Sequence, residues 1–139
     1  MSVLLNPYVS FNGTARQAMG FYQSVFGGQL EIMSFGDMPA METDPAEKDK
    51  VMHSMLHGDN GLVLMGSDTP SSMDYTPFNG QISLSGDDEA TLRGFWAKLV
   101  DGGTVGVPLE KAPWGDSFGM CTDKFGIGWM VNIAGPPAQ

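Results

Sequence analysis

The chain has little cysteine and few basic residues. Its one cysteine, Cys121, excludes an internal disulfide and a zinc site built from several cysteines. Seven Lys and Arg stand against sixteen Asp and Glu, a formal net charge of −9, and so acidic a chain repels nucleic acid and anionic membranes. No apolar run approaches the ~18 residues of a membrane span, and the N-terminus lacks the basic segment of a signal peptide. We therefore expect a cytoplasmic protein without a nucleic-acid or membrane partner.

Apolar residues make up 42% of the 139 residues and charged ones 17%, which is enough apolar surface for one folded domain. Apolar residues at three-and-four spacing predict a helix after Thr14 to about Phe26. An N-cap at Asp87 or Asp88 predicts a second helix over about Glu89 to Val100. A Gly-Gly pair ends each helix. β-branched and alternating apolar runs predict extended segments at residues 4–11, 29–35, 51–58, 62–65, 81–85, 104–109, 117–122 and 127–133.

Three connecting segments differ in composition and in the structure they predict. Asp59-Asn60-Gly61 stands between two apolar runs and predicts a hairpin. Residues 37–50 carry two prolines and many charges without any period, which favours a mobile, solvated loop over a catalytic pair of carboxylates. Residues 67–78 are rich in Ser, Pro and Thr and read as a connector.

The two halves of the chain repeat one another. Gly20-Phe21-Tyr22 matches Gly94-Phe95-Trp96, and Ser10-Phe11-Asn12-Gly13 matches Ser83-Leu84-Ser85-Gly86. Because the matches occur in the same order in both halves, duplication is favoured over chance. We expect a single domain over residues 1–139, with one βαβββ module at 1–66, the connector at 67–78 and a second module at 79–135.

This order predicts an α+β fold in which tandem βαβββ modules form a half-open eight-stranded sheet cup with helices on the outside. Each module is too small to bury both faces of its own sheet. The hollow between two such sheets is the expected small-molecule site, since pockets form at module junctions.

Several motifs are similar to those of the PhnB-like branch of the vicinal oxygen chelate superfamily, which includes glyoxalase I, bleomycin-resistance proteins and extradiol dioxygenases. They are Asn6 to Gly13, Phe21-Tyr22, Ser34 to Pro39 and Asp123 to Asn132. The resemblance covers the chain from Leu5 to Ile133. It implies the tandem βαβββ fold, a small-molecule ligand and a homodimer.

The resemblance also implies where a metal would be held, by a His or Gln on the first strand and a Glu on the last strand of each half. Aligning the Ser10 and Ser83 motifs places Tyr8 opposite Gln81, or Pro7 if the alignment slips by one. The two Glu positions fall on Met65 and Met130. A phenol, an amide and two thioethers are poor ligands for a hard divalent ion, so we expect no metal cofactor.

Other residues are candidates for the same hollow. His53 and His57 are four apart, but on a strand rising ~3.3 Å per residue their Cα atoms lie about 13 Å apart, too far to share one ion. His53 is a candidate hydrogen-bond partner or general base, against a structural histidine. Tyr8, Met65, Gln81, Phe118 and Met130 complete the expected ligand pocket, against the alternative that they only fill the core. Cys121 has no histidine nearby in sequence and is not expected to be a nucleophile.

These observations predict a protein that binds a small molecule in the cup between the modules without the superfamily's usual metal. The alternative is a metal-dependent lyase, isomerase or dioxygenase of the same superfamily that uses ligands such as His53 and Gln81. A third possibility is a dimeric interaction module with an incidental hollow.

Overall fold

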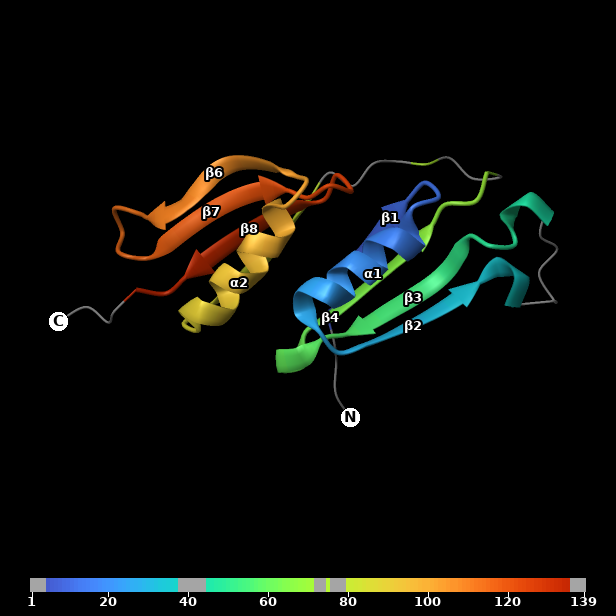
Figure 1. The fold of residues 1–139 in the computed structure, drawn as a ribbon, viewed down its shortest axis with the longest axis horizontal. Coiled ribbons are helices and arrows are strands. Elements are labelled where there is room, and N and C mark those ends of the chain that lie inside the picture. Colours follow the sequence, from blue (N-terminus) through green and yellow to red (C-terminus); the bar gives the residue numbers. More distant parts are fainter. Residues whose placement is uncertain (1–4, 38–44, 72–74, 76–79, 136–139) are drawn as a thin grey trace. The chain divides into compact units, whose positions relative to one another are not determined.

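The computed structural model describes residues 5–37, 45–71, 75 and 80–135. The chain divides into two compact units, Met1–Phe78 and Asn79–Gln139. Each unit contains a four-stranded sheet and one α-helix (Figure 1). The predicted α+β fold of two βαβββ modules is therefore confirmed.

The first unit has a mixed sheet. Its strand order is β1-β4-β3-β2, in which β1 and β4 are parallel and the other neighbours antiparallel. The elements are β1 (Tyr8–Phe11), α1 (Ala15–Phe26), β2 (Gln29–Ser34), β3 (Val51–His57) and β4 (Val63–Asp68), with short 3-10 helices η1 (Phe35–Asp37), η2 (Pro45–Glu47) and η3 (Asp59–Gly61).

The second unit repeats this topology. Its strand order is β5-β8-β7-β6, and the pair of first and last strands, β5 and β8, is again the parallel one. The elements are β5 (Gln81–Gly86), α2 (Glu89–Val100), β6 (Thr104–Lys111), β7 (Ser117–Thr122) and β8 (Gly128–Ile133). Equivalent strands thus occupy equivalent places in both sheets, as duplication predicts.

Helix α1 forms because its apolar residues share one stripe, and this stripe is part of the core of the first unit. The buried residues are the six expected from the spacing: Ala15, Ala18, Met19, Tyr22, Val25 and Phe26. The helix packs against β2, β3 and β4. At Gly66 on β4 a Cβ would lie 3.2 Å from the sulfur of Met19, so this glycine lets the helix approach the sheet closely.

The N-terminus of α1 is capped by a side chain that is distant in the sequence. Thr14 occupies the N-cap position as expected, but its side chain makes no capping hydrogen bond. Instead, the buried carboxylate of Asp68 accepts the backbone N–H groups of Gly13, Ala15 and Val51, each at 2.9 Å.

The connector expected at residues 67–78 begins later than predicted, because residues 67 and 68 belong to β4.

Helix α2 is capped locally. Asp88 accepts the backbone N–H of Thr91. Trp96 packs over β7, where a Cβ added at Gly119 would lie 2.9 Å from the Trp96 ring atom Cη2.

On β8, Trp129 is buried while its neighbour Met130 is half-buried. The Trp129 indole donates a hydrogen bond to Asp123 at 2.8 Å. Trp129 is thus a core residue, as the alternation along the strand predicts.

The loop before β3 is more ordered than expected. Its described part includes η2, and the Glu47 carboxylate is buried rather than solvated. It pairs with Lys50 at 2.7 Å and accepts the backbone N–H of Ser71 at 2.7 Å. These contacts hold the pKa of Glu47 at about 2, chiefly through the Lys50 hydrogen bond. The rest of the predicted loop, residues 38–44, lies outside the described residues.

Among the described residues, no helix has the length and apolar character needed to cross a membrane.

Candidate functional site

The face of the first sheet opposite α1 collects the candidate residues of this unit. Side chains alternate along a strand, and Val9, Phe11, Leu56 and Leu64 are buried on the α1 side. The other side, which we call the first helix-free face, carries the remaining set of residues: Tyr8, Ser10, Gln29, Glu31, Met33, His53, Met55, His57, Val63, Met65 and Ser67. Tyr8, His53 and Met65 therefore share one face of the first sheet.

Tyr8 and His53 are in direct contact on this face. Tyr8 Oη and His53 Nδ1 are hydrogen-bonded at 3.1 Å. Their rings stack with centroids 5.7 Å apart and planes inclined by 27°. Because β4 lies between β1 and β3 in the sheet, this pair spans β4, and each side chain orients the other. Tyr8 is still 43% exposed, so the phenol remains open to a ligand.

Met65 lies beside this pair. It is the register partner of Tyr8 across β1 and β4, and of Met55 across β3 and β4. The next residue in the same row, on β2, is Glu31. The phenol, the two thioethers and the carboxylate therefore form one row across the sheet, next to His53.

The helix-free face of the second sheet holds the other predicted residues. Gln81, Phe118 and Met130 all lie on it, with Met120 as the register partner of Met130. The Asn132 amide on this face donates to Asp116 at 3.0 Å. The pKa of Asp116 is lowered, first by the N–H of Gly135 and then by Asn132.

The strand register corrects the expected match between Tyr8 and Gln81. In the first sheet Tyr8 pairs with Met65, whereas in the second sheet Met130 pairs with Ser83 and Gln81 pairs with Gly128. Ser83 is thus the structural counterpart of Tyr8, two residues from the predicted position. The matched Ser-Xaa-Xaa-Gly letters misled the alignment, because Ser10 lies two residues after Tyr8 on its strand, whereas Ser83 itself occupies the position of Tyr8. Ser83 is thus a further candidate residue that the sequence analysis did not name.

The positions of His57 and Cys121 do not suit a reactive role. His57 is exposed at the end of β3 opposite Gln29. Cys121 is buried, and burial together with the nearby Asp123 charge raises the pKa of its thiol to about 11. A thiol in this state is a poor nucleophile, in line with the sequence-based expectation.

The residues at the superfamily's metal positions do not fit a hard divalent ion. Tyr8 and Met65 in the first sheet, and Ser83 or Gln81 with Met130 in the second, offer hydroxyl, amide and thioether groups. Hard divalent ions require carboxylate and imidazole ligands. Within the described part of the chain, no three His, Cys, Asp or Glu side chains come together in a way that would hold a metal ion.

The fold and these residues can be compared with known proteins. The family model of the glyoxalase/bleomycin resistance protein/dioxygenase superfamily matches residues 4–131. The chain belongs to this superfamily. The family predicted from the sequence motifs is therefore confirmed.

Individual relatives of this superfamily member resemble it over nearly its whole length. Escherichia coli protein YjdN is 32% identical over 142 residues, which cover 93% of this chain and 94% of YjdN. The crystal structure of protein PA1353 from Pseudomonas aeruginosa matches with a TM-score of 0.84 and 40% identity, covering 95% of this chain and 98% of that one.

A PhnB-like structure is also similar. A protein from Bacillus cereus, described as a putative 3-demethylubiquinone-9 3-methyltransferase, PhnB protein, matches with a TM-score of 0.74 and 25% identity. The match covers 95% of this chain and 100% of that one. This superfamily member thus has a PhnB-like structural neighbour.

Proposed function

We propose that this protein binds a small, flat organic molecule on its helix-free faces, without a catalytic divalent ion. The observation that carries the proposal is the stacked, hydrogen-bonded pair of Tyr8 and His53 beside Met65. An aromatic ring, an imidazole and a polarizable thioether bind flat molecules by stacking and dispersion.

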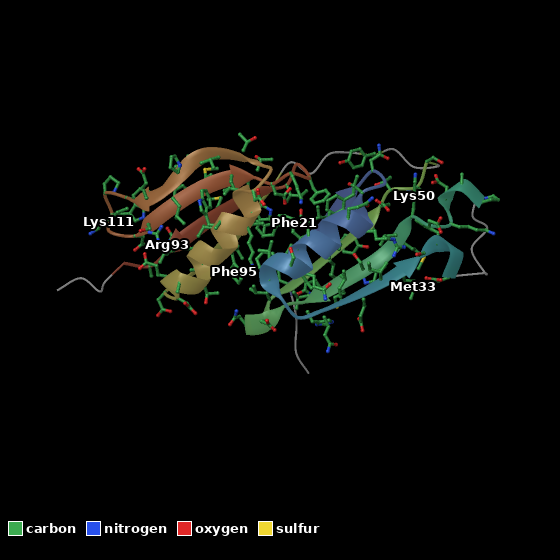
Figure 2. The ribbon with its side chains drawn as sticks, viewed as in Figure 1. Phe21, Met33, Lys50, Arg93, Phe95 and Lys111 are labelled. Carbon is green, nitrogen blue, oxygen red and sulfur yellow. The ribbon has the colours of Figure 1, made fainter. Side chains whose placement is uncertain are left out.

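The charges near these faces favour a neutral or cationic ligand over an anion. All seven Lys and Arg of the chain lie among the described residues, on the helices, in loops or turns, or at the end of β6, namely Arg16, Lys48, Lys50, Arg93, Lys98, Lys111 and Lys124. Figure 2 shows three of them, Lys50, Arg93 and Lys111. The helix-free faces instead carry Glu31 and Glu110, and a carboxylate repels an anionic ligand.

A homodimer is a further part of the proposal. Each sheet ends in two edge strands, β1 and β2 in the first and β5 and β6 in the second. Edge strands expose unpaired backbone groups that proteins cover by association. Light scattering on the purified protein is expected to give twice the mass of the chain.

The test uses three acridines of the same shape and different charge. We expect cationic 9-aminoacridine and neutral acridine to raise the melting temperature, because a ligand that binds the folded state stabilises it. Acridine-9-carboxylate should produce no shift. Tyr8→Phe and His53→Ala should reduce the shift, whereas Tyr75→Phe, which changes an exposed tyrosine outside the sheets, should retain it.

Two outcomes would contradict the proposal. One is no shift with any acridine, or the largest shift with the anion. The other is a stoichiometric divalent metal in protein purified without a tag that is lost from His53→Ala, which would favour the metal-dependent enzyme.

A further inference from the structure

We propose that the first unit binds a soft monovalent cation, Cu(I), through His53, Met55 and Met65. The starting point is the misfit described above: the superfamily's positions for hard ions hold thioethers. Thioether donors select soft ions such as Cu(I) over hard ions such as Mg²⁺ and Mn²⁺, and imidazole is also a ligand for copper. Met65, which is a poor ligand for the usual metal, is therefore one donor of a different site. This inference does not depend on the proposed organic ligand.

The two thioethers are paired across neighbouring strands. Met55 on β3 and Met65 on β4 are direct register partners on the helix-free face. Cβ atoms of such partners lie roughly 4.5–5.5 Å apart. Both side chains are half-buried, so the flexible methionine side chains are within reach of one ion and of solvent.

The third donor lies on the same face. His53 precedes Met55 by two residues on β3, so its side chain projects from the same side of the strand at roughly 6.6 Å along it. The hydrogen bond between His53 Nδ1 and Tyr8 Oη spans β4, the strand that carries Met65. The imidazole is therefore drawn toward the thioether pair.

Tyr8 also selects the state of the imidazole that binds metal. A tyrosine hydroxyl accepts as well as donates. When His53 Nδ1–H donates to Tyr8 Oη, the lone pair of Nε2 is free for an ion. Metal-binding histidines commonly donate their second N–H to such an oxygen, which fixes the ring and increases its basicity. Tyr8 is thus a positioning residue, and Glu31 beside Met55 adds a negative charge that favours a cation.

The second unit provides a matched control. Met120 and Met130 are register partners at the equivalent place on its helix-free face. Their neighbours in the row are Ser83 and Val107, and both histidines of the chain are in the first unit. This second thioether pair lacks an imidazole and should bind the ion weakly. The buried thiol of Cys121 is removed from competition by Cys121→Ala.

The experiment is an anaerobic Cu(I) titration of the whole protein against bathocuproine disulfonate, repeated with redox-inert Ag(I). We expect one ion per chain. Met55→Leu and Met65→Leu, which nearly conserve volume, and His53→Ala should each weaken binding at least about tenfold, and Tyr8→Phe about tenfold. Met120→Leu, Met130→Leu and Cys121→Ala should leave it unchanged.

A second measurement does not depend on any variant. With methionines labelled at the ¹³C-methyl group, Ag(I) should shift two resonances, assigned to Met55 and Met65 by their loss in the leucine variants. The inference is overturned if the wild-type protein does not compete for Cu(I), or if the Met120→Leu and Met65→Leu variants lose affinity equally. Stoichiometric binding of Mn²⁺ with similar affinity would overturn it as well.

Discussion

The carboxylate of Asp68 accepts the backbone N–H of Ala15 at 2.9 Å, which joins the last residue of β4 to the first residue of α1. The same buried carboxylate accepts the N–H groups of Gly13 and Val51. One side chain thereby connects the helix start, the loop before it and β3.

Asp68→Ala is expected to destabilise the protein by about 3–5 kcal/mol, because it leaves buried N–H groups without an acceptor. Urea denaturation monitored by circular dichroism measures the change. The matched control is Asp88→Ala, which removes an ordinary exposed cap of α2 and should cost about 1 kcal/mol. Equal losses in both variants would show that Asp68 is only a local cap.

Gly119→Ala should be destabilising by about 1–3 kcal/mol, as overpacked cores are. The added Cβ would lie 2.9 Å from both Trp96 Cη2 and the backbone Cα of Leu109. Gly94→Ala, within α2, meets nothing within 4 Å and should instead stabilise the protein by about 0.5–1 kcal/mol. Thermal denaturation of both variants measures these opposite signs, and a neutral Gly119→Ala would argue against the packing of Trp96 on β7.

Glu47 should make the stability depend on pH in acid. Its pKa is lowered from 4.5 to about 2 in the folded protein, so between these values the unfolded chain binds more protons than the folded one. The stabilisation is complete above about pH 4.5 and is lost as the pH falls toward 2.

Denaturant titrations between pH 6 and pH 2 measure this effect. The decline in the free energy of unfolding should be smaller in Glu47→Gln and in Lys50→Met, which removes the main cause of the shift. An unchanged pH profile in both variants would contradict the ion pair.

Cys121 should react slowly with thiol reagents in the folded protein. With a pKa of about 11, only about one thiol in a thousand is ionised at pH 8, and the thiolate is the reactive form. Labelling by dithiobisnitrobenzoate should be much faster in urea than in buffer. Since the chain has a single cysteine, the absorbance reports this residue alone, and fast labelling of the native protein would contradict its burial.

The secondary structure was predictable where it depends on local pattern. Both helices begin and end as expected, because an amphipathic stripe and a capping residue are both properties of neighbouring residues. Strand ends were less predictable. β1 is shorter and β4 longer than the apolar runs indicate, because backbone pairing with a neighbouring strand decides where a strand ends.

The sequence by itself determined the superfamily, the duplicated βαβββ order and the alternation of side chains along each strand, since these follow from local periodicity and repetition. Only the tertiary structure decided that Tyr8 contacts His53, that Ser83 rather than Gln81 is the counterpart of Tyr8, and that Asp68 caps α1. These relationships join residues far apart in the chain. They depend on strand register and on the reach of individual side chains, and neither leaves a pattern in the order of the residues.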